Sequence, residues 1–273
     1  MKTFTIKFLA FFSLCAFFLA CNDDDNSDSD PNEDPVLSCI PDALLPDLIA
    51  FYSFSNGSLD DFSGNGYHLT NPTSASPGTD RGGNPNCAFE FNASQNEFLT
   101  YVNPGFLNDL DSNPITISFW FQTIGTRDGG MYEQMIGRDT GIHCPDTYGQ
   151  WSISLSDCRN GVFGINDYSL WAGGFPNFLG DTNCSNNPSL NVWHHIVVTS
   201  DGTGGGINMF IDGIATTSVP GTGCSNPLGT NNVGDLFLGK QFTGLLDDVA
   251  IFDRVLTTAE IIQLNDIEPC CQE

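Results

Sequence analysis

The chain has 273 residues, of which 33 are acidic and 8 are basic, and its formal net charge at pH 7 is −25. This charge excludes nucleic acid as a partner, because proteins bind polyanions by neutralising phosphates with lysine and arginine. The acidity favours solubility and weak self-repulsion instead.

The first twenty residues have the pattern of an export signal. Two lysines precede an apolar run from Phe8 to Ala20, which is too short to span a bilayer as a mature helix. The Phe-Leu-Ala-Cys sequence that ends at Cys21 resembles the lipobox of bacterial lipoproteins, in which the cysteine is acylated and becomes the new N-terminus. We therefore expect a lipoprotein signal peptide at residues 1–20 and lipidation of Cys21. An ordinary secretory signal with an incidental cysteine is the alternative.

Residues 21–38 are predicted to form a disordered tether. The tract after Cys21 is acidic, contains proline and has no aromatic residue, so it cannot bury enough apolar surface to fold. Cleavage before Cys21 would leave 6 basic and 33 acidic residues, a net charge of 6 − 33 = −27. An aspartate run next to a lipidated cysteine resembles the surface-export signal of Bacteroidetes lipoproteins. The resemblance implies an outer-membrane lipid anchor, with the domain facing the cell exterior and the lipid as its only membrane contact.

From Leu48 onward, short apolar or alternating runs recur between turns rich in glycine, proline and asparagine. We expect strands at residues 48–54, 87–91, 98–102, 115–123, 151–155, 161–165, 195–200, 207–211, 236–239 and 245–252. One helix is expected after Thr257, because Glu260 three residues later completes a capping box. Many short strands with a single short helix predict one all-β domain over residues 39–273, with a substantial core.

Eight cysteines remain once the signal peptide and Cys21 are set aside. An even number in an exported chain predicts disulfides, whereas the absence of CxxC pairs and of suitably spaced histidines argues against zinc. The candidates are Cys39, Cys87, Cys144, Cys158, Cys184, Cys224, Cys270 and Cys271. They allow 105 pairings, so the connectivity stays open. Candidate pairings are Cys144 with Cys158, Cys184 with Cys224, and the last two cysteines with Cys39 and Cys87.

Aromatic residues are numerous, and most are expected in the core because they alternate along strands. Trp120 and Trp193 are expected there too. Trp171 lies in a glycine-rich stretch with Tyr168 and Phe175 that has the composition of an exposed loop. Aromatic rings on such loops can stack on a sugar, so these three residues are candidate ligand contacts.

Three segments together resemble a known family. They are a tryptophan-led stretch that begins at Trp193 and ends Ile-Asp-Gly at 213, a late strand and helix from Phe242 to Leu264, and an earlier DFSGNGYH sequence at 61–68. This order of elements resembles the laminin-G-like jelly roll of the concanavalin A-like lectin and glucanase superfamily, over roughly Pro46 to Leu264. The resemblance implies an antiparallel β-sandwich jelly roll with one short C-terminal helix.

Two aspartates are candidate metal ligands. By strand alternation Asp247 shares a face with Val249 and Ile251, so its carboxylate is expected to point inward and to need a partner. Residues 61–68 offer the Asp61 carboxylate, an amide and backbone carbonyls in a glycine-permitted turn, which is an oxygen-rich set that calcium prefers.

In the family, the matching loop and the aspartate of the last strand approach one another around a structural calcium. The resemblance therefore implies Ca²⁺ held by Asp61, Asn65, the carbonyl of His68 and Asp247. The alternative is an Asx turn at Asp61 and a hydrogen-bonded Asp247 without metal.

No catalytic motif was recognised. The superfamily includes retaining glucanases with an ExDxxE strand, and the chain has no such run. Glu97 and Glu133 could meet in space, but nothing local supports a pair. Too few basic residues are present for a polysaccharide lyase, and no GxSxG elbow occurs. His195 matches a structural histidine of the family's W-x-H strand start.

Three functions remain open from sequence alone. The first is a surface-anchored, non-catalytic carbohydrate-binding protein, whose partner would be a polysaccharide or glycoconjugate. The second is a protein-binding or adhesion module, and the third is a cryptic glycoside hydrolase. Fold does not decide between them.

Overall fold

The computed structural model describes residues 39–108, 113–125, 133–138, 151–156, 160–165, 168–173, 191–202, 206–222 and 234–271. All of them belong to one compact unit within Asp34–Glu273. The signal peptide, Cys21 and the tether at 21–38 lie outside the described residues. Within the described ranges, no helix is both long and apolar enough to cross a membrane.

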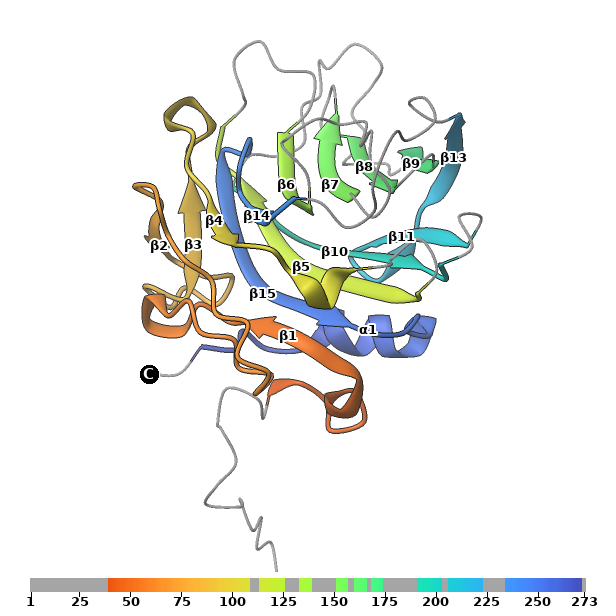
Figure 1. Ribbon diagram of the computed structural model, residues 1–273, viewed down its shortest axis with the longest axis horizontal. Coiled ribbons are helices and arrows are strands. Elements are labelled where there is room, and N and C mark those ends of the chain that lie inside the picture. Colours follow the sequence, from red (N-terminus) through yellow and green to blue (C-terminus); the bar gives the residue numbers. More distant parts are fainter. Residues whose placement is uncertain are drawn as a thin grey trace, which may run out of the picture. The chain divides into compact units, whose positions relative to one another are not determined.

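Fifteen strands and one α-helix follow one another in the described part of the chain (Figure 1). The strands are β1 Leu48–Tyr52, β2 Ser76–Gly78, β3 Ala88–Phe91, β4 Leu99–Tyr101, β5 Ile115–Thr123, β6 Glu133–Arg138, β7 Trp151–Ser156, β8 Asn160–Ile165, β9 Tyr168–Gly173, β10 Trp193–Ser200, β11 Ile207–Ile211, β12 Ile214–Ala215, β13 Thr217–Thr222, β14 Leu236–Leu238 and β15 Gly244–Phe252. The helix α1 spans Thr258–Asp266, and short 3₁₀ turns span Leu45–Asp47, Ser55–Gly57, Ala93–Gln95 and Gly105–Leu107.

The strands form two antiparallel sheets. Sheet A has the order β12-β11-β10-β5-β15-β3-β2, with β1 also paired to β15, and sheet B has the order β13-β9-β8-β7-β6-β14-β4. Apolar side chains from both sheets meet in one core, which includes Phe119 and Ile196 of sheet A and Trp151 and Leu238 of sheet B. The all-β antiparallel sandwich predicted from sequence is confirmed.

Strand β15 is central to sheet A. It pairs with β5 along one edge, while β1 and β3 share its other edge, so it is hydrogen-bonded on both sides over most of its length. All nine of its residues are buried. A second apolar cluster lies on the side of sheet A away from sheet B, where Ile261 and Leu264 of α1 pack against residues such as Phe252.

The helix begins as the sequence predicted. Thr257 is the N-cap, and its hydroxyl accepts a hydrogen bond from the Glu260 amide while the Glu260 carboxylate accepts from the Thr257 amide, which completes the capping box. Arg254 donates to both carboxylate oxygens of Glu260 at 2.9 and 2.8 Å. These bonds, with Arg254 first among their donors, lower the pKa of Glu260 to about 2.

The alternation expected along β15 is broken at Asp248. Its backbone φ of 46° lies in the left-handed region, and the register with β5 shifts between Asp247 and Ala250, which marks a β-bulge. Val249 and Ile251 therefore lie in the core between the sheets, whereas Asp247 lies on the other face, against Arg81. The prediction that these three residues share a face was wrong, because the bulge inserts one extra residue.

Two further expectations are corrected. Trp120 and Trp193 are only half-buried, because they lie on the face of sheet A that points away from the core between the sheets. Residues 168–173 form strand β9, not a loop. Alternating large and small residues fit a strand there as well as they fit a loop.

Two disulfides join the C-terminal tail to the body of the domain. Cys270 bonds to Cys39 and Cys271 bonds to Cys87, with Cα atoms 5.6 Å apart in each pair. These are the pairings considered for the last two cysteines. Cys144, Cys158, Cys184 and Cys224 lie outside the described residues.

We expect the double substitution Cys39→Ser with Cys270→Ser to lower the free energy of unfolding by about 2–5 kcal/mol, because the bond closes a long loop in the unfolded chain. Denaturant unfolding measures the change. Alkylation of the native, unreduced protein followed by mass spectrometry is the control, and a labelled thiol at any of the four described cysteines would contradict the pairing.

Candidate functional site

The Asp61 carboxylate organises the loop that follows β1. Its Oδ1 accepts hydrogen bonds from the amides of Phe51 and Ser63, both at 2.9 Å. Its Oδ2 accepts from the Tyr67 amide at 3.0 Å and from the Ser63 hydroxyl at 2.9 Å. Each oxygen thus takes two protein donors, and the pattern at Ser63 is an Asx turn.

Asn65 and His68 lie in the same loop. The Asn65 amide nitrogen donates to the carbonyls of Leu48 and Ile49, which fixes the loop to the start of β1. The His68 ring nitrogen Nδ1 accepts from the Asp61 amide at 3.1 Å. Three of the four predicted calcium ligands are therefore close together, held by hydrogen bonds to the surrounding backbone.

Asp247, the fourth, is paired with an arginine. Nη1 of Arg81 lies 2.8 Å from Asp247 Oδ2 and 2.6 Å from Asp248 Oδ2, and the three side chains are almost fully buried. The other guanidinium nitrogen, Nη2, donates to the carbonyl of Ile267 in the tail after α1 at 3.2 Å. Arg81 thus bridges the last strand and the C-terminal tail.

An aromatic stack lies beneath the arginine. The Arg81 guanidinium carbon is 4.5 Å from the centroid of the Trp120 ring, a cation–π contact. Trp120 in turn stacks on His195, with centroids 5.1 Å apart. The arginine therefore has charged partners at its edge and an aromatic partner on its face.

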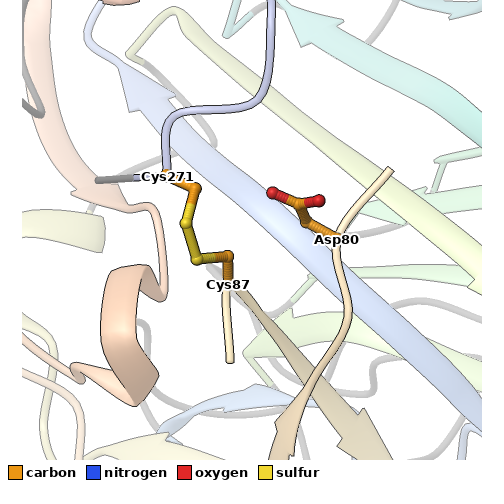
Figure 2. A group of neighbouring side chains, drawn as sticks. All are labelled: Asp80, Cys87 and Cys271. Atoms are coloured by element: carbon orange, nitrogen blue, oxygen red, sulfur yellow. A yellow bond between two sulfur atoms is a disulfide. The ribbon is translucent and has the colours of Figure 1, made fainter. Parts of the chain in front are cut away.

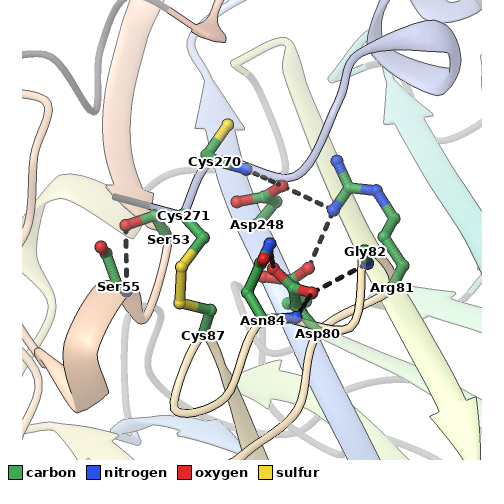
Figure 3. The surroundings of a disulfide bond; sticks show 11 residues. Ser53, Ser55, Asp80, Arg81, Gly82, Asn84, Cys87, Asp248, Cys270 and Cys271 are labelled. Atoms are coloured by element: carbon green, nitrogen blue, oxygen red, sulfur yellow. Dashed lines mark hydrogen bonds and ion pairs between the residues drawn. A yellow bond between two sulfur atoms is a disulfide. The ribbon is translucent and has the colours of Figure 1, made fainter. Parts of the chain in front are cut away.

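Asp80 shapes the loop that presents Arg81, as Figure 3 shows. Its carboxylate accepts hydrogen bonds from the amides of Gly82 and Asn84 and from the Asn84 side chain, each at 2.8 Å. Two buried carboxylates, those of Asp247 and Asp248, therefore contact the guanidinium, and the buried Asp80 carboxylate shapes the loop that carries it. We call these four residues the arginine cluster.

In the arginine cluster, burial and the Arg81 charge shift the pKa of the two β15 aspartates in opposite directions. Burial raises the pKa of Asp247 well above its ordinary value, the negative charge of Asp248 raises it further, and the Arg81 guanidinium opposes both. Burial also raises the pKa of Asp248, again opposed by Arg81. Asp248 Oδ2 accepts from the Cys270 amide at 3.1 Å, while its buried Oδ1 has no hydrogen-bond partner.

One group of potential soft-metal ligands lies beside this cluster. Ligand atoms of Asp80, Cys87 and Cys271 lie within 4.8 Å of one another. Figure 2 shows that the two sulfur atoms are bonded to each other. In the oxidised protein neither sulfur is a free thiolate, so this group is not a metal site.

As arranged, the predicted ligands do not fit a calcium ion. Calcium takes six to eight oxygen ligands, but both Asp61 oxygens already accept two protein donors each. Asp247 is paired with a guanidinium. Calcium binding by Asp61, Asn65, His68 and Asp247 stays a prediction.

A second candidate site lies on sheet B, on the face away from the core. Trp151, Ile153 and Leu155 of β7 are core residues, so the serines between them belong to the opposite face. Strand register pairs the Cα positions of small residues across five strands, starting from Ser152, and we call them the small-residue row. They are Gly137, Ser152, Gly164, Ser169 and Gly221.

Phe237 ends this row on β14, where it pairs with Gly137. The Lys240 ammonium lies 3.4 Å from the Phe237 ring centroid and 5.4 Å from that of Phe98, and the two rings meet edge to face at 5.4 Å. The row is thus bounded at one end by an aromatic pair and one of the few cations in the chain.

Gln134 lies next to the row. It is 3% exposed, and neither its amide nitrogen nor its amide oxygen has a hydrogen-bond partner. A Cβ added at Gly137 would lie 2.2 Å from the Gln134 nitrogen, so the glutamine side chain covers that glycine. A buried amide without partners costs about 1–3 kcal/mol, so Gln134 is an unsatisfied polar group among the described residues of this face.

The predicted aromatic contacts fall partly on this sheet. Trp171 of β9 pairs with Val162 and Val219, in the row of Cα positions that also contains Ser154 and Gln134. Tyr168 is the first residue of β9. Phe175 lies outside the described residues, and ligand contact by all three stays a prediction.

The glutamates considered for catalysis have different surroundings. Glu97 accepts hydrogen bonds from the Ser74 hydroxyl at 2.7 Å and from the Asn92 amide at 2.8 Å, so it stabilises the turn before β4. Glu133 begins β6 and is buried. His195 is buried against Ser118, with 2.8 Å between Nε2 and the hydroxyl oxygen, as a structural histidine would be.

Sequence reasoning missed Arg81, Gln134 and Phe237. Arg81 was one of only 8 basic residues, and a buried aspartate needs a partner, so scarcity of cations was a usable signal. Gln134 and Phe237 carried no such signal, because their neighbours across the sheet come from strands that sequence spacing does not align.

One protein family matches the chain. Laminin_G_3, described as the concanavalin A-like lectin/glucanases superfamily, matches residues 95–262, which is more than half of the chain. No curated protein sequence matches it.

Solved structures with the same fold include binding domains. The binding domain of Paraclostridial mosquitocidal protein 1 has a TM-score of 0.60 and 20% identity, covering 82% of this chain and 52% of that one. Domain 4 of AbnA, a GH43 extracellular arabinanase from Geobacillus stearothermophilus in complex with arabinotriose, has a TM-score of 0.55 and 20% identity, covering 81% and 98%.

The binding domain of botulinum neurotoxin DC in complex with rat synaptotagmin II has a TM-score of 0.55 and 14% identity, covering 82% and 52%. The chain therefore spans about half the length of the two toxin domains. At these identities the likeness shows the fold alone.

His195 should make stability depend on pH. Burial first, and then the Arg81 charge, lower its pKa to about 3, compared with about 6.5 in an unfolded chain. Between these values the unfolded state binds a proton that the folded state does not, so the free energy of unfolding should fall as pH drops from 6.5 toward 3, by about 1.4 kcal/mol per pH unit for this group.

Denaturant unfolding at a series of pH values measures this slope. The substitution His195→Gln should make the slope shallower by about one proton. Equal slopes for the His195 variant and the unchanged protein would contradict the assignment.

Proposed function

Since the chain belongs to the concanavalin A-like lectin/glucanases superfamily, we propose that it is a non-catalytic carbohydrate-binding protein that a lipid anchor holds at the cell surface. The observation that carries the proposal is the buried Gln134 amide, which has no hydrogen-bond partner and lies beside the small-residue row. Sugar hydroxyls both donate and accept, so a bound glycan would satisfy both ends of this amide.

Small residues on neighbouring strands support a ligand that would lie close to the backbone of sheet B. Gly137, Ser152 and Gly164 are buried, so a ligand would have to reach this part of the row below the surface, where neighbouring strands lie about 4.8 Å apart. Phe237, which carries the Lys240 ammonium over its ring, offers an apolar ring edge at the end of the row. This is the kind of group that holds sugars in protein sites.

The charge of the chain supports a neutral glycan. With 33 acidic and 8 basic residues, the surface repels uronates and other polyanions at ordinary ionic strength. Arabinotriose, the ligand of the similar arabinanase domain, is a neutral oligosaccharide. We therefore propose a neutral polysaccharide or glycoconjugate as the partner.

A protein partner is the second candidate. One similar toxin binding domain is in complex with synaptotagmin II, and this chain covers 52% of its length. The cryptic hydrolase is the least supported reading. Glu97 is engaged by a serine hydroxyl and a backbone amide, and retaining or inverting chemistry needs two carboxyl groups that flank one bond.

Attachment at the outer membrane is proposed from the sequence alone. The lipobox-like residues before Cys21 and the aspartates after it support lipidation of that cysteine and export to the outer surface. The acidic tether at 21–38 would then separate the domain from the membrane.

Glycan-array screening followed by calorimetry tests carbohydrate binding. We expect a dissociation constant between micromolar and millimolar, because one or two ring contacts add only about 0.5–1.5 kcal/mol each. Gln134→Ala and Phe237→Ala should weaken binding at least severalfold. Trp171→Ala should do the same, because a sugar is predicted to stack on this ring. Ile214→Ser, at an exposed position on sheet A, is the control.

Three outcomes would redirect this proposal. Capture of a protein partner with no glycan bound would favour the adhesion function. Reducing ends that accumulate with time would make the protein a hydrolase. A glycan that binds equally to the Gln134 and Phe237 variants would place the site elsewhere on the domain.

Mass spectrometry of the N-terminal peptide tests the anchor. We expect the mature protein to start at a diacylglyceryl-modified Cys21, and Cys21→Ser to release the protein from the membrane fraction. Protease shaving of intact cells should remove the domain. Cleavage at another residue, or complete protection from protease, would count against surface anchoring.

A further inference from the structure

The arginine cluster contains Asp247, one of the four ligands that the family resemblance implied for a metal. We propose that the Arg81 guanidinium is the permanent counter-cation of Asp247 and Asp248. The C-terminal tail is then joined to β15 without calcium. The inference concerns stability and is independent of the proposed carbohydrate binding.

The partners of Arg81 suit a guanidinium better than a metal ion. Calcium takes oxygen ligands from all directions, whereas a guanidinium donates hydrogen bonds in its plane and stacks through its face. Nη1 and Nη2 reach two carboxylates and one carbonyl, and the face of the group lies on Trp120 at 4.5 Å. An indole ring offers no oxygen to calcium, but it is a favourable surface for arginine.

The loop that carries Arg81 is built to hold it in place. Asp80 accepts three hydrogen bonds that fold the turn at Gly82 and Asn84. The Cys87–Cys271 disulfide then ties the far end of this loop to the C-terminal tail. A cation on a covalently restrained loop is always present at its site, unlike an ion that must bind from solution.

The charge balance explains why the cation is required. Asp247 and Asp248 are almost fully buried, and a buried carboxylate without a counter-charge is strongly unfavourable. Asp248 Oδ1 has no partner even with Arg81 present. Removal of the guanidinium would leave two adjacent buried carboxylates, which is the arrangement that attracts a divalent cation.

The first experiment measures the melting temperature of the full domain in excess EGTA and in millimolar calcium chloride. We expect the two temperatures to agree. The calcium hypothesis for Asp61 and Asp247 expects a lower melting temperature in EGTA, so such a drop would overturn our inference.

The second experiment uses Arg81→Met, which keeps the length of the side chain and removes its charge. This variant should be less stable and should gain a calcium response, with a rise in melting temperature of roughly 5–10 °C at a hundredfold excess of calcium over its dissociation constant. Magnesium, which prefers a smaller octahedral site, is the ion control. A folded Arg81→Met variant that calcium does not stabilise would overturn the inference.

A third variant covers the case in which Arg81→Met does not fold. In Arg81→Met with Asp247→Asn and Asp248→Asn, the charges that need a counter-cation are gone. We expect this variant to fold and to melt at the same temperature with and without calcium. If it is as unfolded as the single variant, the role of Arg81 is packing and the inference fails.

Discussion

The ion pair between Arg81 and the two aspartates of β15 is the interaction on which the rest of the described structure depends. It joins the loop before β3, the central strand of sheet A and the tail after α1 at a single buried point. Hydrophobic burial alone does not give a unique arrangement of these segments, whereas a buried cation has few positions in which its charge is compensated. The bulge at Asp248 is part of the same arrangement, because it lets consecutive aspartates both reach the guanidinium.

Much of the fold could be predicted because local rules and tertiary packing agree. The strand at 115–123 was predicted at its observed bounds, and the helix begins at the cap that Thr257 and Glu260 indicate. The faces of β15 could not be predicted, since a bulge at a non-glycine residue leaves no mark on hydrophobic alternation. The prediction of a loop at residues 168–173 failed for a related reason. Glycine and aromatic residues are compatible with a loop and also with a strand next to small neighbours.

The candidate sites were harder to predict because both depend on distant pairs. Arg81 and Asp247 are 166 residues apart in sequence, and no spacing rule connects them. The small-residue row exists only once the register of five strands is known. Asp61 and Asn65, which carry part of the family resemblance, do lie close together. Their contacts, however, are hydrogen bonds that shape a loop. The turn that the resemblance implied is therefore present, and hydrogen bonds to the surrounding backbone hold it.

The adjacent cysteines at the C-terminus have a mechanical consequence. A pull on the chain before Cys39 passes through one disulfide to Cys270, across a single peptide bond to Cys271, and through the second disulfide to Cys87 at the start of β3. Tension from a tether would therefore be shared between β3 and the tail before it could peel β1 from the edge of β15. Residues 39–87 could therefore be extended only after a covalent bond had failed, because the two disulfides and the peptide bond between Cys270 and Cys271 close that segment into a loop.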